Sequence, residues 1–196
     1  KQKVLENLTS VLTRQSEKGL FNLAFVHQLA HDFIQIAGPL LILRMVPTLS
    51  NTIQVLLETN EGTDVAVTLI KFASPKERKK MMKSLKGALV GICNHVFAYR
   101  AILAFLSHTD DTTMMKKSFF NEIKDDLLSI ATNQYGSKVI CHILTPETSR
   151  YKSIIDREVV ASMSIPKVDE NGGAVAGETR DSSKKDTATK SAEHMK

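Results

Sequence analysis

An internal repeat is the feature that most constrains how this chain can fold. The segments NEGTDVAVTLIKF, HVFAYRAILAFLS and NQYGSKVICHILT align so that Gly62, Ala98 and Gly136 fall in register, 36 and 38 residues apart. In each copy, apolar residues follow the small residue at the third, fourth, seventh and eighth positions. That spacing places them on one face of a helix. Such a face is buried only when neighbouring units stack, so the repeat predicts an α-solenoid.

Helix signals flank the copies. Ser74 and Glu77 form a capping box, and Pro75 lies at the first helical position after it. Apolar residues also recur at helical spacings in the N-terminal segments VLENLTSVLTRQ and FNLAFVHQLAHDFIQIA. The sequence therefore predicts an all-α protein, a right-handed solenoid with N-terminal helices followed by repeat units centred near 50–86, 87–124 and 125–160. We expect this helical-repeat domain to span residues 1–164.

The remaining residues, 165–196, differ in composition from the rest of the chain. They are rich in Gly, Ser, Thr and charged residues and lack a hydrophobic period. A segment of this kind buries too little apolar surface to offset its ordering entropy, so we predict a disordered tail. The tail holds six basic and six acidic residues, so the chain's net charge of +5 belongs to residues 1–164. A basic folded body favours polyanionic partners.

Candidate catalytic and metal-binding residues do not meet the chemical requirements of either role. His27 and His31 have a zinc-compatible spacing, but Gln28 stands where a metalloprotease needs a glutamate. We interpret the pair as lining a helix packing surface. Cys93 and Cys141 form no CxxC pair and are interpreted as reduced, partly buried thiols of an intracellular protein. The apolar runs are too short to span a membrane. We therefore predict no enzymatic activity, no cofactor, no metal and no membrane partner.

Four motifs carry a resemblance to a known family. In order, they are KGLFNLAFVHQLAHDFI, ASPKERKKMMKSLKG, DDTTMMKK and YGSKVICHILTPETSRY. The repeat itself resembles the Pumilio (PUF) repeat, and over residues 17–152 the motifs resemble the C-terminal CPL region of the Puf-A/penguin-like proteins. The resemblance implies a PUF-like superhelix that continues from upstream PUF repeats and binds RNA or DNA with little sequence preference. It also implies a nucleolar role in large-subunit ribosome biogenesis and pre-rRNA processing, with ribosome-assembly proteins as partners and repression of messenger RNAs in some members.

In sequence-reading PUF repeats, each second helix offers two base-edge side chains and one stacking side chain. The matching sets here are Thr63 and Val67 with stacker Asp64, Tyr99 and Leu103 with stacker Arg100, and Ser137 and Cys141 with stacker Lys138. Val67 and Leu103 have no hydrogen-bonding side chain, and Cys141 is a weak partner. Asp64 would repel a polyanion, whereas Arg100 and Lys138 could contact phosphate. We therefore predict contacts with phosphates rather than base readout.

The densest positive charge follows the first repeat copy, in KERKKMMKSLK. Its basic residues are Lys76, Arg78, Lys79, Lys80, Lys83 and Lys86, against one acid, Glu77. On a helix, Lys79, Lys83 and Lys86 share one face. The functional interpretation is a phosphate-binding ridge, which Lys116 and Lys117 could extend, and the structural alternative is an ordinary solvated helix face.

Two functions of different classes follow from these patterns. The first is an RNA-binding solenoid, located in the nucleolus or nucleus, whose targets are pre-rRNA or mRNA. The second is a protein-docking scaffold for assembly factors or ribosomal proteins, with no direct RNA contact. The apolar edge residues Val67 and Leu103 favour the second function.

Overall fold

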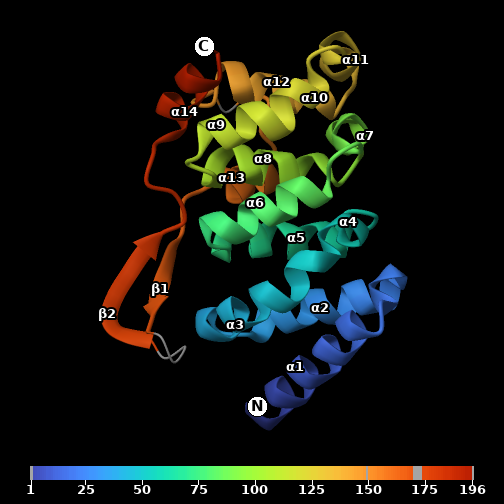
Figure 1. The fold of residues 1–196 in the computed structure, drawn as a ribbon, viewed down its shortest axis with the longest axis vertical. Coiled ribbons are helices and arrows are strands. Elements are labelled where there is room, and N and C mark those ends of the chain that lie inside the picture. Colours follow the sequence, from blue (N-terminus) through green and yellow to red (C-terminus); the bar gives the residue numbers. More distant parts are fainter. Residues whose placement is uncertain (1, 149, 170–173, 196) are drawn as a thin grey trace.

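Short helices stacked in succession form most of this protein, as a computed structural model shows for residues 2–148, 150–169 and 174–195 (Figure 1). The helices are α1 (Gln2–Glu17), η1 (Leu20–Asn22), α2 (Ala24–Ile36), α3 (Pro39–Leu49), η2 (Ser50–Thr52), α4 (Ile53–Leu56), α5 (Asn60–Phe72), α6 (Pro75–Ser84), α7 (Leu89–Asn94), α8 (Tyr99–His108), α9 (Thr112–Met115), η3 (Lys116–Phe120, a π-helix), α10 (Asn121–Ile123), α11 (Leu127–Thr132), α12 (Gly136–Leu144), α13 (Ile154–Val160) and α14 (Thr187–His194). The strands are β1 (Ser164–Val168) and β2 (Ala174–Asp181). None of the described helices is long and apolar enough to cross a membrane.

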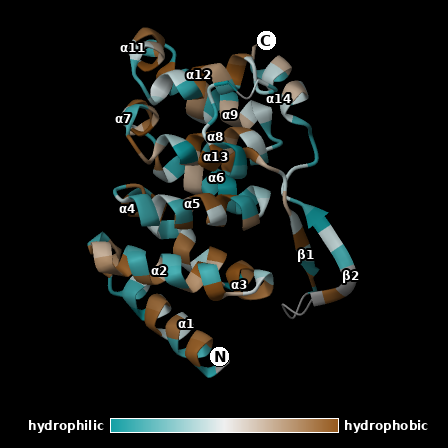
Figure 2. Ribbon diagram, turned by 180° about the vertical axis from the view of Figure 1, so that it is seen from behind, coloured by the Kyte–Doolittle hydropathy of each residue, from teal (hydrophilic) through white to brown (hydrophobic). Residues whose placement is uncertain are grey.

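The helices repeat as units and build a helical solenoid, as predicted. A middle helix of each unit, which we call a second helix, packs on the next one along the chain: α2 on α5, α5 on α8, and α8 on α12. Figure 2 shows these layers from behind. The repeat extends one unit further upstream than the sequence alignment indicated. Gly38–Pro39 lies between α2 and α3 as Ser74–Pro75 lies between α5 and α6.

Local interactions explain where the repeated helices begin. The predicted capping box at α6 is present: the Ser74 hydroxyl accepts from the Glu77 amide at 3.3 Å, and the Glu77 carboxylate accepts from the Ser74 amide at 2.7 Å. At the start of α5, a Cβ on Gly62 would lie 2.2 Å from the Leu56 carbonyl oxygen. A Cβ on Gly136, at the start of α12, would lie 2.4 Å from the Ile130 carbonyl. Two of the aligned small residues therefore admit the close approach of the preceding short helix.

The core contains most of the predicted apolar face. All four predicted positions are buried in the first copy and in the second copy. In the third copy, Val139 and Ile143 are buried and Ile140 is half-buried, whereas Leu144 is 54% exposed. The prediction of one continuous core is thus confirmed, because Val139 and Ile143 belong to the same hydrophobic core as the first two copies, and Leu144 is the exposed exception.

The C-terminal segment, residues 163–169 and 174–195, differs from the predicted disorder. β1 and β2 pair antiparallel, with Ile165 opposite Arg180, and α14 begins with Asp186 accepting from the Thr189 amide at 2.7 Å. The low apolar content of this segment predicted disorder, but hydrogen bonds to the solenoid hold the segment in place. Residues 170–173 of the predicted tail lie outside the described residues.

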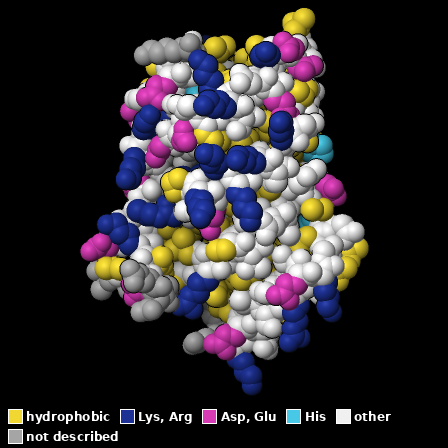
Figure 3. Space-filling model, in the orientation of Figure 1, with side chains coloured by type: hydrophobic (Ala, Val, Ile, Leu, Met, Phe, Trp, Pro, Cys, Tyr) yellow, Lys and Arg dark blue, Asp and Glu magenta, His cyan; other side chains and the backbone are white. Residues whose placement is uncertain are grey.

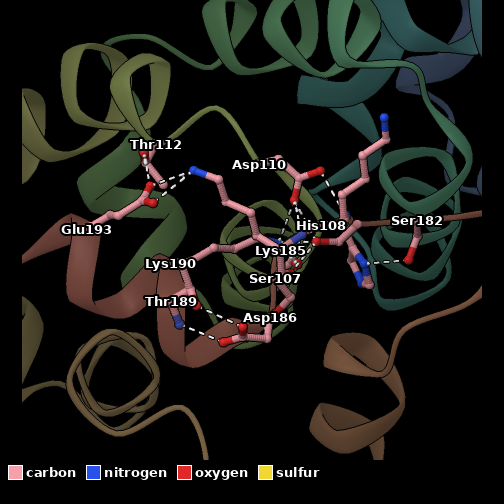
Figure 4. A network of polar contacts seen from close by, with 12 residues as sticks. Ser107, His108, Asp110, Thr112, Ser182, Lys185, Asp186, Thr189, Lys190 and Glu193 are labelled. Atoms are coloured by element: carbon pink, nitrogen blue, oxygen red, sulfur yellow. Dashed lines mark hydrogen bonds and ion pairs between the residues drawn. The ribbon is translucent and has the colours of Figure 1, made fainter.

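Polar side chains of the C-terminal segment meet the ends of three second helices. Arg180 donates to the Phe72 carbonyl of α5 at 2.7 Å, Lys190 to the Ser107 carbonyl of α8, and Ser191 to the Ile143 carbonyl of α12. Carbonyls in the last turn of a helix lack partners within that helix, so these donors cap them. Figure 4 shows Lys190 reaching toward Ser107 and Asp110, where the ammonium lies 3.3 Å from the Asp110 carboxylate.

Candidate nucleic-acid interface

Exposed lysines gather on the outer face of α6 and just beyond its C-terminal end. We call five of them, Lys76, Lys79, Lys80, Lys83 and Lys86, the lysine ridge, and every one is solvent-exposed. Lys116 and Lys117, at the start of η3, are exposed as well. Figure 3 shows dark-blue Lys and Arg side chains across the middle of this face, over the α6 and α9 region of Figure 1. The predicted concentration of charge on one helix is therefore also a surface feature.

Two grooves flank α6 and share Lys83. The first, of about 550 Å³, lies on the η2 side and is lined by Ser74, Lys76, Lys79 and Lys80 among others. The second, of about 590 Å³, lies between α6 and η3 and is lined in part by Lys86, Lys117, Ser118 and Asn121. Ammonium, hydroxyl and amide groups are donors that suit phosphate oxygens.

An acidic residue, Glu122, also lines the second groove. Its carboxylate accepts from the backbone amides of Gly87 at 2.9 Å and Leu89 at 3.0 Å. Through these bonds the carboxylate caps free backbone amides at the start of α7. They also offset part of its charge beside the lysines.

Arg78 does not belong to this surface, which corrects the prediction that it contacts nucleic acid. Its side chain is only 3% exposed. Its guanidinium donates to the carbonyls of Ile70 at 2.8 Å, Lys71 at 2.9 Å and Ser182 at 2.8 Å, and also to the carbonyl of His108. Burial, followed by the charge of nearby Arg180, lowers its pKa to about 10, so it stays positive at neutral pH. Arg78 thus joins the ends of α5 and α8 to the C-terminal segment.

Arg100 is another predicted contact that the structure buries, at 4% exposure. Its guanidinium lies 2.6 Å from the Asp64 carboxylate and donates to the Asn60 side-chain carbonyl at 2.7 Å. The predicted stacking positions of two successive units therefore pair with each other. Asp64 neutralises Arg100, and the arginine is not free to stack on a base.

Lys138, the third predicted stacker, is also engaged. Its ammonium lies 2.9 Å from the Asp156 carboxylate and 3.0 Å from the Tyr99 hydroxyl, which itself donates to Asp156 at 2.7 Å. Burial alone would raise the pKa of Asp156, but the hydrogen bonds from Tyr99, Lys138 and Ser153 outweigh it and lower that pKa. Burial opposes the charge of Lys138 as well, yet its bonds to Tyr99 and Asp156 raise its pKa. The carboxylate and the ammonium therefore both stay charged at neutral pH.

The remaining base-edge positions offer little to a ligand. Thr63 and Leu103 are fully buried, Tyr99 is 5% exposed and Val67 is 6% exposed. Ser137 is half-buried and donates to the Gln134 carbonyl, and Cys141 is half-buried. The structure thus places the predicted base-reading row on the second helices but leaves few of its side chains free.

His27 and His31 do not converge on a metal site. His27 is buried, with its ring nitrogens 2.8 Å from the Thr59 hydroxyl and 2.6 Å from the Phe21 carbonyl. Its role in helix packing is therefore confirmed. Within the described ranges, no cluster of His, Cys, Asp or Glu side chains could hold a metal ion.

Sequence reasoning missed several residues of these sites. Ser118 and Asn121 line the second groove, but they are neutral and lie one repeat beyond the basic cluster. Asp156 was missed although Ser153 precedes it by three residues, a capping-box spacing that the structure confirms. That spacing could have located α13, though not the surface that α13 covers.

Sequence comparisons with known proteins find similarity to Pumilio homologues. No family model matches the chain. Pumilio homolog 3 of Homo sapiens is 28% identical over 144 residues, which cover 73% of this chain and 22% of that protein. Pumilio homology domain family member 6 of Saccharomyces cerevisiae is 27% identical over 165 residues, which cover 84% of this chain and 25% of that protein. The chain thus spans about a quarter of the length of these curated relatives.

Solved structures agree with these sequence matches. The crystal structure of human Puf-A matches with a TM-score of 0.81 at 25% identity, covering 98% of this chain and 35% of that chain. Human Puf-A in complex with DNA matches with a TM-score of 0.82. The Puf3 RNA binding domain, bound to a Cox17 RNA recognition site, matches with a TM-score of 0.53 at 18% identity, covering 78% of this chain and 43% of that chain. The Puf3 match supports the fold alone.

Proposed function

We propose that this chain, which is a Puf-A-like region with a Pumilio-type helical-repeat fold, binds nucleic acid through its phosphates. The observation that carries the proposal is the lysine ridge, four exposed lysines on α6 and one just beyond its end, beside two grooves. Human Puf-A has been solved with DNA, and the Puf3 domain with RNA. Those complexes support nucleic acid, RNA or DNA, as the ligand class.

Such binding tolerates changes of sequence. Phosphate contacts carry no base information, and each one releases counterions, so affinity falls steeply with salt. Among the described residues, no aromatic side chain lines either groove, so base stacking contributes little there. The second helices offer few free base-reading groups. The ligand is therefore recognised by its charged backbone.

The cellular role that we propose rests on the resemblance of the four sequence motifs to the Puf-A/penguin-like family. It is a nucleolar role in large-subunit ribosome biogenesis and pre-rRNA processing, joined in some members of the family by repression of particular messages. Pre-rRNA or mRNA would be the ligand, and ribosome-assembly proteins the partners. Crosslinking of the full-length protein to RNA in cells, with mapping of the attached peptides, would identify the target and the contact surface together.

Charge variants test the proposed surface. The triple variant Lys79→Gln, Lys80→Gln and Lys83→Gln should weaken binding to unrelated RNA sequences equally. It should also reduce the slope of log affinity against log salt by about 2 to 3, since each phosphate contact contributes about 0.7 to 0.9. The matched control changes Lys3, Arg14 and Lys18, which are exposed on or just beyond α1, to Gln. Unchanged binding by the ridge variant, or an equal loss in the control, would contradict the proposal.

A protein-docking scaffold is the second candidate function. The apolar residues that first favoured it, Val67 and Leu103, are buried and so cannot dock a partner. A different observation now favours it: Leu127 and Leu128 on α11 are 45% and 78% exposed. Partners that remain bound after nuclease treatment, and that are lost when Leu128 is changed to Asp, would support docking.

A further inference from the structure

The helix α13 has an inverted distribution of side chains. Asp156 is fully buried, whereas Ile154 and Ile155 are 75% and 52% exposed. Surface helices ordinarily bury their apolar residues and expose their carboxylates. Val159, at 4% exposure, is the one apolar side chain of α13 that is buried in the core, and Val160 is half-buried. Polar contacts, rather than apolar burial, therefore hold α13 in place.

These polar contacts come from three successive second helices. Lys71 of α5 donates to the Glu158 carbonyl at 2.5 Å, and His108 of α8 lies 2.9 Å from the Val159 carbonyl. Tyr99 of α8 and Lys138 of α12 both bond the Asp156 carboxylate. Tyr99 occupies a base-edge position and Lys138 a stacking position of the PUF pattern, so a carboxylate of the chain itself lies on the row that faces nucleic acid in that pattern.

The position of α13 also breaks the order of the solenoid. In the preceding units, the helix that follows the second helix lies on the outer side, as α6 packs beside η3. α13 instead packs on α8, and α14 lies beside α9 and α12. In Figure 1, α6 and α9 face the viewer and α13 is seen behind them.

We propose that α13 is a displaceable helix that covers the face formed by the second helices α5, α8 and α12. Its release would expose Lys71, Tyr99 and Lys138 as a second phosphate-binding surface, separate from the lysine ridge. Phosphate oxygens accept hydrogen bonds from the same donors that hold Asp156 and the carbonyls of α13. A seven-residue helix with one fully buried apolar side chain has little stability of its own, so it can open without unfolding the solenoid. This inference rests on the proposed function.

Hydrogen exchange tests the displacement directly. The amides of residues 154–160 are compared in the whole chain, with and without a saturating RNA oligonucleotide. We expect RNA to speed exchange in α13 while the amides of α5 and α8 keep their protection. Unchanged or slower exchange in α13 would mean that it is a fixed part of the fold, which overturns the inference.

Variants at the start of α13 test the link to affinity. The Ser153 hydroxyl accepts from the Asp156 amide at 3.1 Å, so Ser153→Ala weakens the helix without touching a donor of the covered face. The loss of an N-cap corresponds to about a fivefold shift in the docking equilibrium, and RNA affinity should rise by up to that factor. Ser153→Asn, which keeps a capping oxygen, should match the original protein. Lys138→Gln added to Ser153→Ala removes both a contact that holds α13 and a donor to phosphate, so it should release α13 further without a further rise in RNA affinity.

The two proposals fail in different ways. If the unaltered chain binds no RNA, or binds it without dependence on the lysine ridge, the proposed function fails. If binding depends on the ridge while Ser153→Ala leaves both affinity and α13 exchange unchanged, the displacement alone fails. Far-UV circular dichroism of each variant, together with protection of the α5 amides, confirms that the solenoid remains folded.

Discussion

The outer and inner sides of α6 both carry basic residues, but the two sides serve opposite purposes. Lys79 and Lys80 are exposed on the outer side, beside a groove. Arg78, their neighbour in the chain, is 3% exposed and bonds four main-chain carbonyls. The planar fork of arginine can serve several carbonyls at once, whereas a flexible lysine ammonium suits a mobile phosphate. The position of a basic residue around the helix thus decides between stability and binding.

Elsewhere in the molecule, too, basic residues are held by the fold and are not free to bind a ligand. Arg100, Lys138 and Lys190 are all engaged by carboxylates, namely Asp64, Asp156 and Asp110. A buried charge is tolerated only when it is paired and hydrogen-bonded. A count of basic residues therefore overestimates the charge that is available to a polyanion.

The largest effect should follow from removing the buried arginine. Arg78→Met leaves four carbonyls without their donor, and each unsatisfied buried group costs about 1 to 3 kcal/mol. We expect the free energy of unfolding, measured in urea, to fall by about 3 kcal/mol or more. Lys79→Met, the adjacent control, should change it by less than about 0.5 kcal/mol. Equal losses in the two variants would remove the distinction between the two sides.

Acid should weaken the buried polar contacts of α8 and α12 as well. Burial lowers the pKa of His108 and of His142 to about 3, below the ordinary value of 6.5. A depressed histidine pKa means that the unfolded chain binds the proton more readily. The stabilisation is therefore complete above pH 6.5 and is lost as the pH falls from 6.5 toward 3.

The expected loss is on the order of 1 kcal/mol per pH unit for each imidazole. Urea unfolding at pH 7, 6 and 5 measures it, and His142→Asn should roughly halve the slope. A stability that does not change between pH 7 and 5 would show that the two imidazoles are not held neutral.

A smaller effect distinguishes Lys138 from Lys83. Lys138→Gln leaves the buried Asp156 without its counter-ion and should cost about 1.5 to 3 kcal/mol of folding stability. Lys83→Gln should leave stability unchanged and reduce the salt slope of RNA binding by about 0.7 to 0.9. Thermal unfolding and salt titrations of both variants form the test. A Lys83 variant that loses stability but keeps its salt slope would reverse the assignment.

The smallest expected effect concerns the edge of the ridge. Lys117 lines the second groove and Lys116 does not, although both are exposed. Lys117→Gln should therefore reduce the salt slope of RNA binding by up to about 0.9, and Lys116→Gln by less. Identical slopes for the two variants would indicate that the groove itself does not direct the phosphates.

Periodicity predicted the solenoid well, because repeated stripes and helix caps are local patterns. Arg78 was misplaced because it was counted with the basic cluster, although the helical phase sets it off the face that Lys79, Lys83 and Lys86 share. The partner of Arg100 lies one repeat away, so the alignment placed Asp64 and Arg100 at equivalent positions without showing that they touch. The order in the C-terminal segment could not be predicted, because its donors meet carbonyls that only the assembled solenoid brings together.

The caps that Arg180, Lys190 and Ser191 provide have a consequence for how this protein can change in evolution. One continuous segment meets the last turns of α5, α8 and α12, so the spacing of three helix ends must match the spacing of three donors. A residue inserted within α8 would shift its final carbonyls relative to Lys190 and break the hydrogen bond between Lys190 and the Ser107 carbonyl. We therefore expect natural variation in length to be confined to the loops before the second helices, away from this edge.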